Sequence, residues 1–143
     1  NKLIFIDSNR KKINFLKILL QNLKFKNNQK IMTLHSRLEA FHLNDLSSKV
    51  ILVARAVGEI NKILKNIISF LSRNNIKNAT FVYYAGPNFI MPENRIMKSS
   101  QSSKDRKKTS DSTYGISGKI FDYTYQEKTI RRKLAIFNVK NLK

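Results

Sequence analysis

The chain has 143 residues, with 28 lysines and arginines against 9 acidic residues, a formal charge of +19 and no cysteine. This length suits one domain, the lack of cysteine excludes disulfides and thiolate metal sites, and no apolar run approaches the roughly 20 residues that cross a bilayer. We therefore expect a cytoplasmic monomer with no membrane segment, whose charge favours a nucleic-acid partner, although a genome rich in A and T would also raise the lysine content.

Strand and helix patterns alternate in the first part of the chain. Residues 2–6 form an apolar run that predicts a strand, and apolar side chains at three- and four-residue spacing over 13–23 predict an amphipathic helix. A second strand is expected at 30–34, followed by a helical turn at 37–41. Residues 49–53 are nearly all apolar and are expected to form a central strand buried on both faces.

The next pair of elements repeats this order. The spacing of apolar residues over 59–71 predicts another amphipathic helix, and residues 79–84 predict a fourth strand that Gly86-Pro87 ends. Tyr83 and Tyr84 either lie in the core of that strand or stack on a nucleic-acid base.

The last part of the chain begins with a polar segment. Residues 98–112 contain no apolar side chain to offset the entropy of ordering them, so we expect a mobile insertion. The glycines of the 115–118 segment indicate a turn, and residues 119–125 and 133–139 predict an antiparallel hairpin. The whole order predicts an α/β fold with a mostly parallel sheet that ends in this hairpin.

Ligands of open parallel sheets bind at the carboxyl ends of the strands. Asp7 closes the first predicted strand, where a carboxylate can accept the hydroxyl hydrogens of a ribose. Alternatively, Asp7 only caps the following helix. His35 and His42 are too few for a metal site, and structural or surface roles are expected for both.

Three short motifs follow predicted strands in order: Phe5-Ile6-Asp7-Ser8, then Ser36-Arg37-Leu38-Glu39, then Ala54-Arg55-Ala56. This succession resembles the family of bacterial small-subunit ribosomal RNA guanine-N7 methyltransferases, also called the glucose-inhibited division protein B family. The resemblance implies a Rossmann-like class I methyltransferase sheet and the cofactor S-adenosyl-L-methionine. It also implies methyl transfer to N7 of a guanine in 16S ribosomal RNA, with the small ribosomal subunit as partner.

In similar proteins, the residue matching Asp7 lies near the adenosine of the cofactor, and those matching Leu38 and Glu39 contact its adenine end. The residue matching Arg55 contacts the cofactor near the reacting centre. A buried Arg55 would be costly without a carboxylate, which the methionine part supplies; an internal ion pair with Glu39 or Glu59 is the alternative. No catalytic side chain and no metal are implied, because alignment of an activated methyl donor supplies much of the rate.

The chain also departs from the family pattern. The family's glycine-rich loop after its first strand is absent, and Ala85-Gly86-Pro87-Asn88 stands where a lysine-glycine pair usually follows the fifth strand. We therefore expect residues 1–143 to be a partial methyltransferase domain that lacks the first strand, which would lie between the strands ending at Asp7 and Val53, and to be inactive alone. The alternative function is a noncatalytic basic α/β module that binds RNA.

Overall fold

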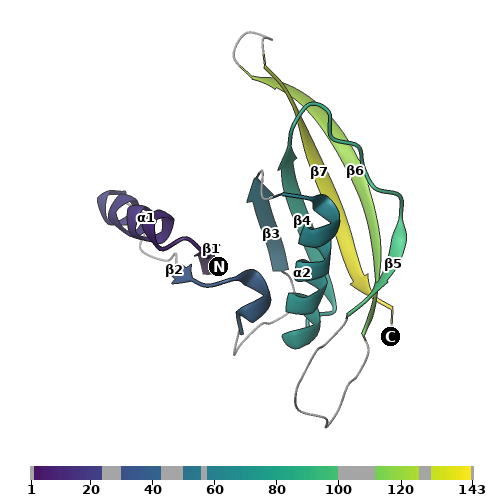
Figure 1. Ribbon diagram of the computed structural model, residues 1–143, viewed down its shortest axis with the longest axis horizontal. Coiled ribbons are helices and arrows are strands. Elements are labelled where there is room, and N and C mark those ends of the chain that lie inside the picture. Colours follow the sequence, from purple (N-terminus) through teal and green to yellow (C-terminus); the bar gives the residue numbers. More distant parts are fainter. Residues whose placement is uncertain are drawn as a thin grey trace. The chain divides into compact units, whose positions relative to one another are not determined.

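The computed structural model describes residues 2–23, 30–42, 50–55, 58–99, 112–125 and 130–142. The chain divides into two compact units, Asn1–Phe41 and His42–Lys143, and each unit has its own sheet (Figure 1). The predicted mixed α/β class is confirmed. Lys49 and Ala56 of the predicted strand and motif, and residues 100–111 of the predicted insertion, lie outside the described residues.

The first unit is one strand, helix, strand repeat followed by a short turn. Its elements are β1 (Lys2–Asp7), α1 (Arg10–Asn22), β2 (Lys30–His35) and the 3-10 helix η1 (Leu38–Ala40). β1 and β2 are parallel, in a register that runs from Lys2 opposite Lys30 to Asp7 opposite His35. Because parallel strands need a crossover, α1 carries the chain back and buries Ile13 as it does so. Both strands consequently end at the same edge of the sheet.

The second unit is a five-stranded sheet with one helix. Its elements are β3 (Val50–Arg55), α2 (Ile60–Arg73), β4 (Asn78–Ala85), β5 (Arg95–Lys98), β6 (Thr113–Tyr125) and β7 (Ile130–Asn141). The strand order is β3-β4-β7-β6-β5. Only β3 and β4 are parallel, and the other three pairings are antiparallel.

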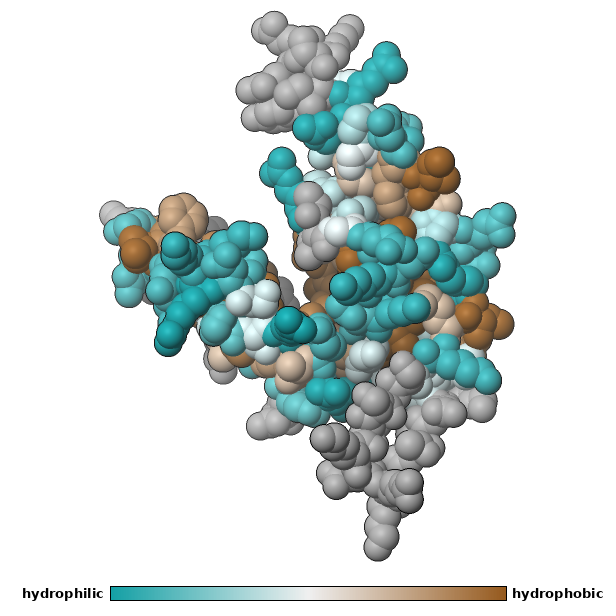
Figure 2. All heavy atoms as spheres, viewed as in Figure 1, coloured by the Kyte–Doolittle hydropathy of each residue, from teal (hydrophilic) through white to brown (hydrophobic). Residues whose placement is uncertain are grey.

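The core of the second unit lies between α2 and one face of this sheet. The apolar stripe of α2 is buried, and its opposite surface is hydrophilic (Figure 2). Alternate residues of the strands face the helix, because side chains of a strand alternate between its two faces. The largest fully buried side chains of the strands are Phe81, Tyr114, Phe137 and Val139. Phe81 and Phe137 are directly opposite in register, and their rings stack with centroids 5.6 Å apart.

The other face of this sheet is not covered within the unit. Ile51 and Val53 of β3 are 61% and 64% exposed, and Tyr84, Phe121 and Tyr123 are also exposed. Within the second unit, β3 is therefore not the predicted central strand buried on both faces. This strand lies at the edge of its sheet, with β4 as its one described neighbour, and its burial alternates along its length.

Two further predictions differ from the structure. The single, mostly parallel sheet predicted for the whole chain is divided into two sheets, of which the one in the second unit is mostly antiparallel, and residues 115–118 belong to β6 rather than to a turn. Gly118 pairs with Phe137, and an added Cβ would lie 2.9 Å from the Met91 Cε and 3.1 Å from the Ile136 carbonyl oxygen. The glycine therefore serves a close approach between chain segments inside a strand.

The short strand β5 was not expected from the sequence. It pairs with the first residues of β6, and Lys98, the first residue of the predicted insertion, is its last residue. Beyond it, the backbone of Ser99 donates to Ser112, and the buried Ser99 hydroxyl accepts hydrogen bonds from Ser72 and from the Ser112 amide. These hydrogen bonds join Ser99 to Ser112 and to Ser72 of α2.

Candidate functional site

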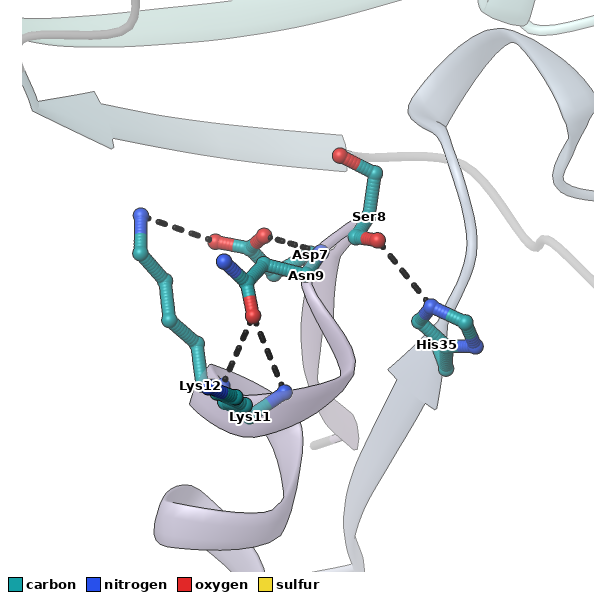
Figure 3. Close-up of polar contacts among 6 residues, drawn as sticks. All are labelled: Asp7, Ser8, Asn9, Lys11, Lys12 and His35. Carbon is teal, nitrogen blue, oxygen red and sulfur yellow. Dashed lines mark hydrogen bonds and ion pairs between the residues drawn. The ribbon is translucent and has the colours of Figure 1, made fainter.

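Asp7 ends β1 and its carboxylate is held by the first turn after the strand (Figure 3). Oδ1 accepts the backbone amide of Asn9 at 2.7 Å, and Oδ2 lies 3.7 Å from the Nζ of Lys12. The helix cap itself is Asn9, whose side chain accepts the amides of Lys11 and Lys12. The alternative in which Asp7 is itself the cap is therefore wrong, although Asp7 supports the capping residue.

The end of β2 is joined to the end of β1. The backbone amide of Ser36 donates to the Asp7 carbonyl oxygen at 3.1 Å, and the His35 Nε2 lies 3.0 Å from the Ser8 carbonyl oxygen, to which it can donate (Figure 3). η1 begins two residues after Ser36, and both Leu38 and Glu39 are half-buried. The sequence motif containing Leu38 and Glu39 thus follows directly from the strand end beside Asp7.

The Asp7 carboxylate retains the capacity to hold a ribose. Each carboxylate oxygen has two lone pairs, and Oδ1 and Oδ2 each have one partner among the described residues. The side chain is also 32% exposed, so a ligand can reach it. Leu38 offers an apolar surface suited to the face of a purine, and Glu39 offers a carboxylate suited to its exocyclic amine. These side chains offer two hydrogen-bond acceptors and one apolar surface, which is the chemistry that the ribose hydroxyls, the exocyclic amine and the ring face of an adenosine require.

Arg55 is the last residue of β3, in the second unit. The expectation that it is a buried charge is wrong, because its side chain is exposed. Among the described residues of the second unit, Arg55 forms no ion pair with Glu59. The alternative pairing with Glu39, which belongs to the first unit, stays a prediction. Its guanidinium is therefore available to a carboxylate from a ligand.

The segment after β3 contains a glycine that the sequence analysis did not single out. Gly58 has a φ of +108°, which favours glycine, and its carbonyl oxygen accepts the Tyr83 hydroxyl at 3.4 Å. Tyr83 is buried and packs against Phe81 and Phe89. Tyr83 thus has the core role that was one of the two expected, whereas Tyr84 on the opposite face is exposed.

The second unit has two further hollows, and none of the predicted site residues lines them. One hollow is lined by Lys65, Ser69, Met97 and Lys98, and another is lined by residues of β5, β6 and β7. Across the part of the chain that the structure describes, no group of three or more potential metal ligands occurs. Within the same residues, no helix is long and apolar enough to span a membrane.

Comparison with known proteins identifies the family. The model of the GidB family, described as rRNA small subunit methyltransferase G, matches residues 1–107. No curated protein matches the sequence. A crystal structure of a candidate methylase from Haemophilus influenzae resembles the chain with a TM-score of 0.46 and 15% identity, covering 99% of this chain and 67% of that one. The family match spans 107 of the 143 residues, and the chain belongs to the GidB family of small-subunit ribosomal RNA methyltransferases.

Proposed function

We propose that the chain is a methyltransferase that uses S-adenosyl-L-methionine and modifies N7 of a guanine in 16S ribosomal RNA, as a cytoplasmic monomer. Family membership supports the transfer of a methyl group to ribosomal RNA. The observation that carries the cofactor is the accessible Asp7 carboxylate at the carboxyl end of β1, next to the segment that holds Leu38 and Glu39. A charge of +19 suits a polyanionic substrate.

Each proposed cofactor residue has a separate task. Asp7 accepts the ribose hydroxyl hydrogens, Leu38 covers the adenine ring, and Glu39 accepts a hydrogen bond from the edge of that ring. Arg55 pairs with the carboxylate of the methionine part. The cofactor supplies a methyl group activated by a positively charged sulfur, so these side chains bind and align it rather than act as acid or base.

We also propose the sheet arrangement of a Rossmann-like class I methyltransferase. β1 has β2 as its one described neighbour, and β3 has β4. Both β1 and β3 therefore carry an edge with backbone groups that another strand can pair with. A further parallel strand that pairs with both edges would make β1, β2, β3 and β4 parts of one parallel sheet, whose ligands bind at the carboxyl ends.

Because residues 1–143 alone are expected to be inactive, the experiment uses a form extended at its N-terminus by a glycine-rich loop and by a strand that could pair with β1 and β3. It is a calorimetric titration with S-adenosylhomocysteine, together with transfer of a labelled methyl group to small ribosomal subunits. We expect binding heat from the wild-type chain, a weaker affinity after Arg55→Ala, and an unchanged affinity after Arg73→Ala, which removes an arginine at the end of α2. Label in the RNA should be at N7 of guanine. No heat from the wild-type protein, or equal affinity in Arg55→Ala, contradicts the cofactor assignment.

A noncatalytic RNA-binding module is the second candidate. The four glycines of the chain are Gly58, Gly86, Gly115 and Gly118, all in the second unit. None is near Asp7 in sequence, where a glycine-rich loop would approach the methionine part of the cofactor. The same titration separates the two candidates, because a module of this kind would retain RNA binding and give no heat with S-adenosylhomocysteine.

A further inference from the structure

The far end of the β6–β7 hairpin projects beyond the other strands of its sheet (Figure 1). β4 ends at Ala85, which lies opposite Lys133 of β7. On the other side, β5 extends along β6 only to Ile116. The hairpin residues beyond Lys133 and its partner Asp122 therefore have no neighbouring strand among those described, and they form a two-stranded ribbon.

Two aromatic rings lie on one face at this end of the hairpin, Tyr123 in the ribbon and Phe121 at its base, where Leu134 still pairs with β4. Phe121 and Tyr123 are two residues apart in β6, so they point to the same side. By the parity of the register, this is the side opposite α2, because Tyr114 and Ile116 of the same strand are buried on the α2 side. Phe121 is 49% exposed and Tyr123 is 38% exposed. Exposed rings that lie next to one another among polar residues can mark a contact surface.

Cations surround these rings. Arg132 lies directly opposite Tyr123 in the ladder, and Lys119 precedes Phe121 on the same face. Arg131 is exposed on the reverse face of the ribbon. Asp122 is the one acidic residue in the described parts of 117–125 and 130–142. It lies opposite Lys133, so the surface around the rings stays positive.

We propose that this projecting ribbon binds unpaired RNA, with Phe121 and Tyr123 stacking on bases and Arg131 and Arg132 contacting phosphates. Aromatic rings spaced along a positively charged surface are the arrangement that single-stranded nucleic acid recognises, because every base has a face that can stack. The family match ends at residue 107, so it does not extend to this hairpin. The inference rests on the proposed function at one point, the choice of RNA as the negatively charged ligand of the ribbon.

The aromatic rings distinguish unpaired RNA from a duplex. Duplex RNA is recognised through its shape, its hydroxyls and its phosphates, which need cations but no exposed rings. A ribbon that used Arg131 and Arg132 alone would bind single and double strands by charge. The rings therefore predict a preference for a single strand over a duplex of the same length.

The test measures affinity for a short unstructured RNA at several salt concentrations, using the full chain. The variant Phe121→Ala/Tyr123→Ala should bind about tenfold more weakly or worse, with little change in salt dependence. The variant Arg131→Gln/Arg132→Gln should also bind more weakly. Each lost phosphate contact makes the slope of log affinity against log salt shallower by about 0.7, so the double variant should change it by about 1.4.

Control variants carry comparable changes elsewhere in the chain. Phe15→Ala removes an exposed phenylalanine from α1, and Lys62→Gln/Lys65→Gln removes two exposed cations from α2. Both controls should keep the wild-type affinity to within a factor of about two. The variant Phe121→Tyr/Tyr123→Phe keeps both rings and should keep the affinity. A melting temperature of the alanine variant close to that of the wild type would show that its loss of affinity comes from the rings rather than from misfolding.

Several results would overturn the proposal. It fails if the wild-type chain does not bind the RNA, if the alanine variant binds as tightly as wild type, or if a duplex competes equally well. A lower melting temperature of the alanine variant with unchanged RNA affinity would assign the rings to packing. Failure of S-adenosylhomocysteine binding would remove the proposed methyltransferase function and leave this RNA result standing, so the two failures are distinguishable.

Discussion

The Asp7 carboxylate accepts the backbone amide of Asn9 at 2.7 Å, while the Asn9 side chain accepts the amides of Lys11 and Lys12 that begin α1. The strand end and the helix start are thus one hydrogen-bonded unit. A helix begins with amides that have no partner within the helix, and Asn9 satisfies two of them. Asp7 orients the capping residue and keeps its own remaining lone pairs free for a ligand.

Substitutions at Asp7 and Asn9 should therefore have separable effects. Asn9→Ala should lower the free energy of unfolding by about 1 kcal/mol, because it removes the cap. Asp7→Asn keeps an oxygen for the Asn9 amide and should have a smaller effect on stability, yet it should weaken S-adenosylhomocysteine binding because the charge is lost. Denaturant unfolding and calorimetry measure the two. Equal loss of ligand affinity in both variants would mean that Asp7 acts only through the cap.

Gly118→Ala should destabilise the second unit. Its Cβ would lie 3.1 Å from the Ile136 carbonyl oxygen in the neighbouring strand and 2.9 Å from the Met91 Cε. Met91 can move, but the backbone of β7 cannot move freely, and we expect a loss of about 1–3 kcal/mol. Gly86→Ala is the matched control, since nothing lies within 4 Å of its added Cβ. A melting temperature that falls equally in both variants would contradict this account.

These glycines show where sequence reasoning reached its limit. The boundaries of β1, α1 and α2 followed from apolar spacing and from the polar residues between Asp7 and Asn9, which are local signals. Gly115 and Gly118 suggested a turn because glycine weakens a strand. Their cause is long-range: Leu142 and Met91 lie close to where a Cβ would be, and no spacing rule shows such contacts.

The site residues divide in the same way. Asp7, Leu38 and Glu39 were predicted from motifs at strand ends, and the first unit places the strand ends that bear them side by side. The burial of Arg55 was mispredicted because the apolar sequence of β3 suggested neighbours on both sides. Whether a strand is central depends on which other strands pair with it, and the residues of the strand itself do not indicate those partners. β5 was missed because four residues are too few for a periodic signal.

Tyr114 should make the free energy of unfolding fall at alkaline pH. Burial raises the pKa of its phenol above the ordinary value of 10.0, and hydrogen bonds with the side chains of Asn141 and Ser112 oppose part of that rise. Below pH 10 the phenol is neutral in both the folded and the unfolded chain, so its contribution to the stability of the folded chain is fully present. Above pH 10 the unfolded chain loses the proton first, and stability falls as pH rises toward the folded pKa.

The variant Tyr114→Phe isolates this effect. Near neutral pH it should be less stable than wild type by about 1 kcal/mol, because the Ile76 carbonyl oxygen loses the hydroxyl that donates to it at 3.2 Å. Melting temperatures of both proteins across the alkaline range provide the measurement. The advantage of the wild type should narrow above pH 10, and a constant difference would show that Tyr114 does not titrate with unfolding.

Arg55 provides the sharpest test of the proposed cofactor site, because two ligands differ in the group that it is proposed to bind. S-adenosylhomocysteine has a carboxylate, whereas 5′-methylthioadenosine has the same adenosine without the amino acid. Arg55→Ala should weaken the first by about tenfold to a hundredfold and leave the second unchanged, while Arg55→Lys should give an intermediate loss because it keeps the charge without the paired donors. Since Arg55 is exposed, neither change should alter the melting temperature.

Asp7→Asn should weaken both ligands, because both contain the ribose. If Arg55→Ala lowered the affinities for the two ligands equally, Arg55 would not contact the carboxylate of S-adenosylhomocysteine.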